Sequence, residues 1–288
     1  MRILITGGAG VVGRALCREL IKRGVCARVI TLPGDSLASE LPPEVEVRYG
    51  DITDYSSVCQ AFESVDAVCH LAAVLLSTDE SVFDKVNACG TENVIRACNE
   101  FHVKRLLYVS SISVTYPILT PYGKSKLRGE SLVRESNLEW TIVRPTLVIG
   151  ENGGIEFNIF AGYVCRFPVY FLPGGGGALK RPVRSVDLVS GIASAVLSRV
   201  SLGKTYALAG PKVMTMREMA YRILKLRNKR HLMLPLPWWI SRKLAVLKNW
   251  IGGSRVSAEQ ALAGFLYDAA PDIENAKIDL NYNPQDAL

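Results

Sequence analysis

The chain has 288 residues, of which 49% are hydrophobic and 21% charged, and it carries a formal net charge of +7. This length and composition predict a soluble globular protein with a substantial core, built as one large α/β domain or as one domain with a smaller lobe. The modest positive charge suits anionic ligands such as phosphates, but no aromatic and basic recognition motif accompanies it, so we expect no nucleic-acid partner.

The cysteines and the first residues bear on compartment and on metal binding. Seven cysteines form no C-x-x-C pair and make an odd count, which argues against a zinc site and against a disulfide framework. We therefore expect no bound metal, and reduced thiols in a cytoplasmic protein. The chain begins directly in an apolar run, so no signal peptide is expected, and no apolar stretch reaches the ~20 residues that span a bilayer.

Apolar, β-branched runs alternate with helical patterns through about residue 150. The expected strands are 2–6, 26–31, 45–49, 66–71, 104–110 and 139–144, and the expected helices are 11–23, 54–63, 81–101 and 122–136. Strands that are apolar throughout and separated by helices imply a parallel sheet covered on both faces. We therefore predict a doubly wound, Rossmann-like α/β fold that binds its ligands at the carboxyl ends of the strands.

The regular alternation of strand and helix patterns ends after Gly150. Glycine and proline become frequent, the segments become shorter, and clear helical patterns remain only near residues 185–199 and 215–228. The run "PGGGG" predicts a mobile loop. We expect a dinucleotide-binding domain over residues 1–150 and a smaller C-terminal substrate-binding lobe over 151–288, interleaved with the end of the sheet.

Three glycines separate the first expected strand from the first expected helix. Gly7, Gly10 and Gly13 follow the spacing G-x-x-G-x-x-G. Glycine lets the backbone turn sharply and approach a pyrophosphate, and the helix that follows offers free N–H groups and a partial positive charge to that anion. The position between a strand and an amphipathic helix supports a dinucleotide site rather than a plain tight turn.

Together with later motifs, this turn resembles the extended short-chain dehydrogenase/reductase family, also called the NAD-dependent epimerase/dehydratase family. The resemblance covers nearly the whole chain. It rests on Thr6-Gly7-Gly8-Ala9-Gly10-Val11-Val12-Gly13, Gly50-Asp51-Ile52-Thr53-Asp54, His70-Leu71-Ala72-Ala73, Asn87 with Gly90-Thr91, Tyr122-x-x-x-Lys126, and Arg144-Pro145.

The resemblance implies where the cofactor lies. Asp51 would hydrogen-bond the adenine edge, Ile52 would pack on it, and the Pro145 segment would border the nicotinamide. His70 is expected to be a packed core residue, because a lone histidine shows no proton-transfer geometry. The full set of expected cofactor-binding residues is Gly7, Gly10, Val11, Val12, Gly13, Thr31, Asp51, Ile52, Leu71, Ala72, Ala73, Asn87, Tyr122, Lys126 and Pro145.

The second expected strand ends without either residue that usually distinguishes the two nicotinamide cofactors. An acidic side chain there would bind the ribose 2′-OH of NAD and repel the 2′-phosphate of NADP. The family's acidic position holds Thr31, and the next position, often arginine in phosphate-binding members, holds Leu32. Thr31 can hydrogen-bond either form, while Arg14 and Arg28 are near enough in sequence to meet a 2′-phosphate. The sequence predicts NAD or NADP, with NADP preferred.

The stretch from Ser111 to Lys126 holds three residues that fit the family's hydride-transfer chemistry. Tyr122 and Lys126 are four residues apart, so on a helix they face the same way. A tyrosine titrates near ~10, and a neighbouring ammonium would lower that pKa. The resemblance implies that Tyr122 carries the proton, Lys126 holds the nicotinamide ribose and Ser111 holds the substrate oxygen, with Ser113 as a second candidate.

The gap between Ser111 and Tyr122 is shorter than in typical nucleotide-sugar epimerases and dehydratases. It resembles the family's atypical branch, which includes isomerase-like and reductase-like members and the non-catalytic accessory subunit of respiratory complex I. That subunit generally lacks the full catalytic set, whereas this chain retains all three residues. We therefore expect a catalytically competent site in which the loop that covers the substrate is shorter than usual.

Substrate recognition is expected from residues after Arg144. The candidates are Thr146, Asn152, Asn158, Arg181 and Arg184. Arg181 and Arg184 could hold a diphosphate, although ordinary surface arginines would look the same. Residues 238–251 form an amphipathic pattern that predicts either a lid packed on the second lobe or a helix in weak contact with a membrane surface.

Three functions remain open from the sequence. The first, which the sequence favours, is an NAD(P)-dependent oxidoreductase or epimerase of a nucleotide-diphosphate sugar, supported by the two arginines. The second is a dehydrogenase or reductase of an apolar ketone or alcohol (steroid-like, isoprenoid-like or polyketide-like), favoured by the trimmed loop. The third is a non-catalytic cofactor-binding subunit, which the retained catalytic set argues against. Family members often dimerise through helices such as 81–101 and 122–136, so a homodimer also stays open.

Overall fold

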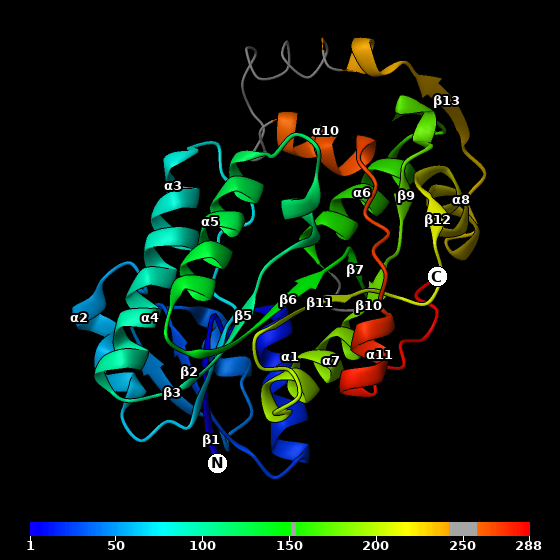
Figure 1. The fold of residues 1–288 in the computed structure, drawn as a ribbon. Coiled ribbons are helices and arrows are strands. Elements are labelled where there is room, and N and C mark those ends of the chain that lie inside the picture. The colour runs from blue at the N-terminus through cyan, green and yellow to red at the C-terminus, as the bar shows by residue number, and fades with distance from the viewer. Residues whose placement is uncertain (151–153, 242, 244–257) are drawn as a thin grey trace.

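A seven-stranded sheet forms the centre of the molecule (Figure 1). The computed structural model describes residues 1–150, 154–241, 243 and 258–288. The strand order is β11-β6-β5-β4-β1-β2-β3, and all neighbours are parallel. The strands are β1 (Arg2–Thr6), β2 (Cys26–Thr31), β3 (Glu46–Tyr49), β4 (Ala67–His70), β5 (Arg105–Val109), β6 (Glu139–Pro145) and β11 (Lys204–Leu208). The order reverses between β1 and β4, so the predicted doubly wound, Rossmann-like fold is confirmed.

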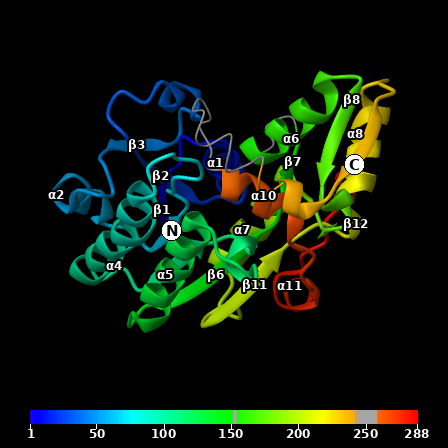
Figure 2. The same cartoon turned by 90° about the horizontal axis from the view of Figure 1, so that it is seen from above.

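Helices cover both faces of the sheet, as Figure 2 shows from above. One face carries α1 (Val11–Lys22), α7 (Ser185–Leu197) and α11 (Glu274–Leu280), and the other carries α2 (Tyr55–Val58), α4 (Gly90–Glu100) and α5 (Pro121–Glu135). Alternation along β1 explains the two layers, because successive side chains point to opposite faces. Ile3 and Ile5 belong to the core under α1 and α7, and Leu4 belongs to the core under α4 and α5.

Two of the expected helices are subdivided. The helical pattern over 54–63 consists of α2 and the 3₁₀ turn η2 (Cys59–Phe62). The pattern over 81–101 begins as α3 (Ser81–Phe83), widens into the π-helical η3 (Asp84–Cys89) and continues as α4. The other short turns are η1 (Ser36–Glu40), η4 (Ile112–Thr115) and η5 (Gly174–Gly176).

Beyond residue 150, short strand pairs and helices build a second layered region with its own core. Its helices are α6 (Ile155–Arg166), α8 (Met216–Leu226) and α10 (Ala258–Leu266). Its strands are β7 (Val148–Ile149), β8 (Val169–Pro173), β9 (Leu179–Lys180), β10 (Val183–Arg184), β12 (Met214–Thr215) and β13 (Leu232–Leu236), paired as β7–β10, β8–β13 and β9–β12. The "PGGGG" run is a packed turn, because Arg217 donates to the Gly175 carbonyl at 2.8 Å and Gly176 is buried.

The two regions are interleaved along the chain. α7 packs beside α1, and β11 adds the last strand to the sheet next to β6. Arg105 on β5 ties them together, because its guanidinium donates to the Ala195 carbonyl at 2.7 Å and to the Ser201 hydroxyl at 2.8 Å. Among the described residues, no helix is long and apolar enough to cross a membrane.

Candidate active site

The glycine turn between β1 and α1 has a shape that only glycine permits. Gly7 has a φ of +69°, and a Cβ there would lie 2.8 Å from the backbone of Ala72. A Cβ on Gly13 would lie 2.5 Å from the Cα of Gly8. The turn and the helix can approach each other this closely only because both positions lack a side chain.

Gly10 occupies a different environment, at the N-cap of α1. Its φ of −65° suits any residue, and a Cβ there would meet only the carbonyl oxygen of Gly7, at 3.3 Å. The missing side chain therefore leaves open space next to the first turn of α1, where Val11 and Val12 present backbone N–H groups that the helix itself does not use. This space and these donors fit the pyrophosphate of a dinucleotide.

An acidic side chain does lie near the end of β2. The Thr31 hydroxyl donates to Oδ2 of Asp35 at 2.6 Å, and the Leu37 N–H donates to Oδ1 at 3.0 Å. Asp35 is half-buried and caps η1. The sequence analysis missed it because Asp35 lies four residues beyond the strand, and the turn at Pro33 and Gly34, where Gly34 has a positive φ, brings it back toward Thr31.

The two arginines considered for a 2′-phosphate are already engaged. The Arg14 guanidinium donates to the Ala9 carbonyl and pairs with Glu40 at 3.2 Å. Arg28 is 5% exposed and pairs with Glu46 at 2.8 Å. Neither residue offers an unpaired cation at the end of β2.

The expected adenine-side residues follow β3. Oδ1 of Asp51 accepts from the Thr53 N–H at 2.8 Å, which fixes the turn. Ile52 is 6% exposed, and a Cβ on Gly90 would lie 2.7 Å from its Cδ1. The pairing explains why glycine stands at position 90.

His70 is a packed structural residue, as expected. Burial lowers its pKa to about 3, so the ring is neutral. The Thr91 hydroxyl donates to the Asn87 carbonyl at 2.7 Å, so its oxygen accepts from Nε2 of His70 at 2.9 Å. Nδ1 then accepts from the Thr6 hydroxyl at 2.6 Å, and Thr6 accepts from the Ala72 N–H.

Asn87 connects the segment after β4 to the helix that carries Tyr122. Its side-chain amide donates to the Val74 carbonyl and to the Ser125 hydroxyl, both at 3.0 Å, and its Oδ1 accepts from the Val74 N–H at 2.8 Å. Asn87 is fully buried, whereas residues 71–73 are half-buried. Asn87 therefore holds the 71–74 segment in place.

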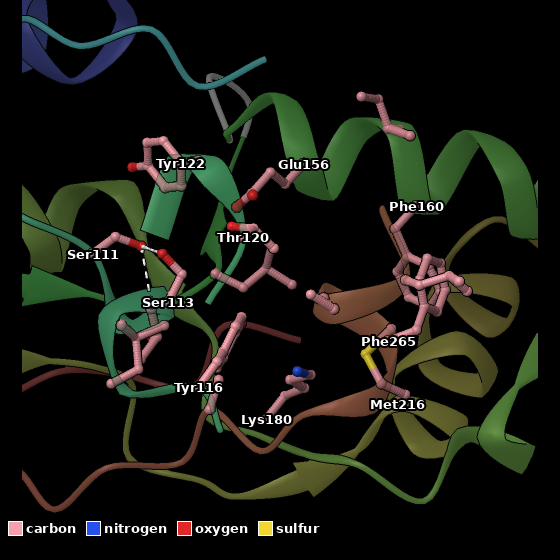
Figure 3. Close-up of a pocket in the computed structure, with 18 of the residues that line it drawn as sticks. Ser111, Ser113, Tyr116, Thr120, Tyr122, Glu156, Phe160, Lys180, Met216 and Phe265 are labelled. Atoms are coloured by element: carbon pink, nitrogen blue, oxygen red, sulfur yellow. Dashed lines mark hydrogen bonds between the residues drawn. The ribbon is translucent and has the colours of Figure 1, made fainter. Parts of the chain in front are cut away.

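Ser111, Ser113 and Tyr122 lie together at one end of a cavity (Figure 3). The Ser113 hydroxyl donates to Oγ of Ser111 at 3.0 Å, and the Ser113 N–H donates to the same oxygen at 3.2 Å. Tyr122 is the second residue of α5; Pro121 is the first, and the Thr120 side chain caps the helix. The short loop between Ser111 and Tyr122 therefore still brings the hydroxyls of both residues to one place.

Burial favours the neutral forms of Tyr122 and Lys126. Burial and the Glu156 carboxylate raise the pKa of Tyr122, while a hydrogen bond with Ser111 lowers it. Burial lowers the pKa of Lys126 to about 7, and its ammonium lies 4.1 Å from the centre of the Tyr108 ring. The lowered pKa expected for the tyrosine is not observed, because burial outweighs the hydrogen bond with Ser111.

The cavity has a volume of about 360 Å³ and is mainly apolar. Ser111, Ser113 and Tyr122 form one end. Aliphatic and aromatic side chains of α6, α10 and the loops form most of the rest: Leu76, Ile112, Pro145, Leu147, Ile159, Phe160, Pro173, Met216, Leu262 and Phe265.

Two ionisable residues in this cavity escaped the sequence analysis. Glu156 on α6 and Lys180 on β9 both line it, and Figure 3 shows both side chains pointing into it. The surrounding cavity walls desolvate the Glu156 carboxyl and raise its pKa, although the residue as a whole is exposed to solvent, and burial lowers the pKa of Lys180 to about 8. Glu156 is the only acidic residue in the apolar run 155–165. A single acidic residue in an apolar run is the sequence feature that could have indicated a site residue here.

The expected substrate residues are dispersed. Thr146 lines the cavity and donates to the Arg181 carbonyl at 2.6 Å. Arg184 pairs with both carboxylate oxygens of Asp187, at 2.8 and 2.9 Å. Arg181 donates to the carbonyls of Gly210 and Pro271. Neither guanidinium lines the cavity.

Two further candidates complete that set. Asn158 lies on the exposed side of α6. Asn152 lies outside the described residues.

A family model matches this arrangement of motifs. Residues 3–167 match the NAD dependent epimerase/dehydratase family. The chain belongs to this family. It is therefore an NAD(P)-dependent enzyme of the epimerase/dehydratase or dehydrogenase/reductase kind, as the sequence predicted.

Curated relatives extend the similarity. The chain is 29% identical over 304 residues to y4nG, an uncharacterized protein of Sinorhizobium fredii, covering 98% of this chain and 74% of that one. It is 32% identical over 177 residues to the 2-alkyl-3-oxoalkanoate reductase of Stenotrophomonas maltophilia. That match covers 52% of each chain, so the chain matches only about half of that reductase's length.

Solved structures share the fold over the whole chain. A dTDP-glucose 4,6-dehydratase from Streptomyces venezuelae, solved with NAD bound, has a TM-score of 0.77 and 22% identity. The match covers 99% of this chain and 92% of that one.

Proposed function

We propose that the protein is an NAD(P)-dependent dehydrogenase or reductase of an apolar ketone or alcohol. The observation that carries this proposal is the cavity, whose walls are mainly apolar and whose one end holds Ser111, Ser113 and Tyr122. Removing apolar surface from water contributes about 25 cal/mol per Å². A few hydroxyls at one end then orient the reacting oxygen. The similarity to an oxoalkanoate reductase supports the same substrate class.

The side chains divide the chemistry between them. Ser111, supported by Ser113, hydrogen-bonds the substrate oxygen. Tyr122 is protonated at neutral pH, because its pKa is raised, so its hydroxyl can donate the proton when a carbonyl is reduced. Lys126, four residues after Tyr122 on the same helix, orients the nicotinamide ribose. The bound nicotinamide dinucleotide supplies or accepts the hydride.

The remaining cofactor contacts follow the same proposal. The turn at Gly7, Gly10 and Gly13 holds the pyrophosphate, with Val11 and Val12 as N–H donors. The other expected residues that line the dinucleotide are Thr31, Asp51, Ile52, Leu71, Ala72, Ala73 and Pro145. Asn87 acts as a positioning residue, because its amide is fully used within the protein.

A nucleotide-diphosphate sugar is the second candidate substrate. The solved dehydratase with the same fold supports it. Against it stand the two arginines expected to hold the diphosphate. Arg184 already pairs with Asp187, and Arg181 already binds backbone carbonyls. A nucleotide sugar would have to displace these partners.

Turnover assays separate these candidates. Wild-type protein and Tyr122→Phe are incubated with reduced and oxidised cofactors and two probe panels, one of steroid ketones and 3-oxoalkanoate esters and one of UDP- and GDP-sugars. Cofactor fluorescence and product chromatography follow the reaction. We expect turnover of an apolar ketone, slowed ~10²-fold or more in Tyr122→Phe with cofactor affinity unchanged.

The other outcomes are informative. Conversion of a nucleotide sugar alone would replace our proposal with the second candidate. Cofactor binding with no turnover of any probe would favour a non-catalytic subunit.

All seven cysteines are free in the structure, which supports a reducing, cytoplasmic setting for the assay and for the protein.

We also propose that NAD, rather than NADP, is the cofactor. The carboxylate of Asp35 is held at the end of β2 by Thr31, which is the place where an acidic group binds the ribose 2′-OH and repels a 2′-phosphate. Both nearby arginines are paired with acids or carbonyls. This reverses the preference that the sequence favoured.

Calorimetric titration of both cofactors tests this assignment. Wild-type protein should bind NAD at least about tenfold more tightly than NADP, a difference of about 1.4 kcal/mol. Asp35→Asn removes the charge but keeps the shape, so it should strengthen NADP binding and leave NAD binding within a few fold. Glu44→Gln, an exposed acid outside this turn, is the charge-matched control. Tighter binding of NADP to the wild type would refute the assignment.

A further inference from the structure

A continuous apolar patch covers one side of the second region. We define the apolar patch as Ile155, Ile159 and Tyr163 on α6, Val169 and Phe171 on β8, and Leu232 on β13. The three α6 residues are four apart and share one helix face. Val169 pairs with Leu232 across the two strands, so their side chains share a face with Phe171.

The α6 and strand parts of the apolar patch are joined. The Tyr163 hydroxyl donates to the Phe171 carbonyl at 2.5 Å and accepts from the Phe171 N–H at 3.2 Å. Ile159 is 51% exposed, Phe171 48% and Leu232 60%. Exposed apolar side chains that gather on one surface in this way favour an interaction site.

The apolar patch continues into the cavity. Ile159 and Tyr163 belong to both, since each is exposed on the surface and also lines the cavity. Phe265, which lines the cavity, packs edge-to-face on the Tyr163 ring at 6.5 Å. The apolar patch and the mainly apolar wall of the cavity therefore meet at Ile159 and Tyr163, which gives an apolar molecule a route from the surface to the site.

The surroundings of the apolar patch are strongly basic. Residues 219–241 contain five lysines and arginines and no aspartate or glutamate. Lys229 donates to the Cys165 carbonyl at 2.7 Å, which brings the basic end of α8 to the end of α6. The Arg166 guanidinium lies 5.2 Å from the centre of the exposed Phe167 ring. The charge is therefore next to the patch.

Exposed tryptophans add a third feature. Trp238 and Trp239 follow β13 directly and are 57% and 53% exposed. Tryptophan prefers the boundary between the acyl chains and the headgroups of a bilayer. Exposed aliphatic and aromatic side chains, tryptophan and acid-free basic segments are the combination that binds an anionic lipid surface.

We propose that the apolar patch and its basic surroundings dock this protein on the surface of an anionic phospholipid bilayer, from which an apolar substrate enters the cavity. The docking stands on the surface alone, while the entry of substrate rests on the proposed function. A second copy of the chain is a poorer occupant, because the basic segments of two copies would face each other and repel. The predicted membrane contact of residues 238–251 falls mostly outside the described residues, and the apolar patch does not depend on it.

Vesicle co-sedimentation without cofactor or substrate tests the docking, so it is independent of the enzymatic assays. The vesicles are pure phosphatidylcholine, or phosphatidylcholine with phosphatidylglycerol. Wild-type protein should bind the phosphatidylglycerol vesicles at least about tenfold better, and added salt should weaken this binding. The double variant Phe171→Ser/Leu232→Ser should lose the binding at least about tenfold.

Two further variants keep the test decisive. Ile278→Ser changes an even more exposed apolar residue on α11, away from β13 (Figure 1), and should bind like wild type. Arg227→Glu/Arg230→Glu leaves the apolar patch intact and should also weaken binding to phosphatidylglycerol vesicles, which covers the case in which the serine variant fails to fold.

Three results would overturn the proposal. One is the absence of wild-type binding to phosphatidylglycerol vesicles, and another is equal binding to both vesicle types. The third is a dimer in analytical ultracentrifugation that Phe171→Ser/Leu232→Ser converts to a monomer while wild-type protein leaves vesicles unbound. That last result would assign the patch to a second copy of the chain.

Discussion

Burial determines the protonation of the candidate catalytic residues before any ligand arrives. Tyr122 is held protonated, and Lys126, whose pKa is about 7, is divided between its charged and neutral forms near neutral pH. A bound nicotinamide would add the positive charge that favours a phenolate when it is oxidised. The protein alone is therefore prepared to donate a proton, which is the role needed for carbonyl reduction.

Gly10 offers the sharpest single-residue test of the cofactor site. Gly10→Val should abolish NAD binding, because its side chain would enter the open space beside the first turn of α1. The fold should survive, since the φ of Gly10 is ordinary and a Cβ there would meet a single atom at 3.3 Å. Calorimetry with NAD measures the loss. Gly162→Val, with no neighbouring atom within 4 Å, is the matched control. Unchanged affinity in Gly10→Val would remove the turn from the cofactor site.

The sequence predicted those site residues that act through local backbone or helical spacing. The glycine turn and the Tyr122–Lys126 pair are of this kind, since their geometry follows from a few neighbouring residues. The role of Arg184 could not be predicted in this way, because it depends on which acidic group the long side chain reaches. In the structure that group is Asp187, in the first turn of α7. The side chain of Asp35 likewise depends on a turn conformation that the spacing alone does not specify.

At the scale of elements, α5 matters most, because it carries both Tyr122 and Lys126. An ion-pair cluster fixes it to the sheet. Glu130 is fully buried and pairs with Arg144 on β6 at 2.7 Å and with Arg134 at 2.9 Å. The same cluster sets the height of the helix relative to β6, and therefore the position of Tyr122 above the strand ends.

Replacing Glu130 should weaken this attachment. Glu130→Gln leaves the guanidiniums of Arg134 and Arg144 without their carboxylate, but these side chains are 35% and 24% exposed, so their charges are not stranded in the core. The loss of charge-assisted hydrogen bonds of this kind costs about 1.5–3 kcal/mol. Urea unfolding at neutral pH measures the loss. Glu135→Gln, the next acidic residue of the same helix but exposed, is the control and should change little.

The pH dependence gives this prediction a signature. Burial raises the pKa of Glu130, but the hydrogen bonds and charges of the arginines outweigh it, so the pKa lies below its usual value. A lowered carboxyl pKa stabilises the fold above the unfolded-state pKa, about 4.3, and this stabilisation disappears as the pH falls. The difference between wild type and Glu130→Gln should therefore shrink below about pH 4. A difference that stays constant with pH would show that the carboxylate charge is not responsible.

The element pattern was largely predictable, and the cavity was not. Strands buried on both faces read as apolar runs, so β1 to β6 lie within one or two residues of the six expected strands. The last strand of the sheet, β11, and the short strands of the second region are not among those expected. The cavity walls come from α6, β9 and α10, which are far apart in sequence and carry no periodic signature of a shared site. Glu156 and Lys180 come to line the same cavity only after the chain has folded.

At the scale of the whole molecule, residue 150 separates two parts of the sequence that share one of the two cores of the sheet. The core beneath α1 is shared, and about half of it comes from residues 183–282. Among these are Leu188, Ile192 and Tyr206, all buried against the sheet. The core beneath α4 and α5 is built from residues before 150 alone. The separate boundary at residue 150 stays a prediction that a truncation can test.

A chain shortened to residues 1–150 should not fold stably. It would lack α7 and α11, which leaves only α1 on one face of the sheet and exposes the rest of that face, and it would lack β11, which leaves β6 as an unpaired edge. An exposed apolar face and an open edge strand both favour aggregation. Arg105 would also lose its partners at Ala195 and Ser201 and stay buried in the sheet without them. Circular dichroism should show one cooperative thermal transition for the full chain and none for the fragment. A cooperative transition in the fragment, with NAD binding retained, would show instead that residues 1–150 are an independent domain.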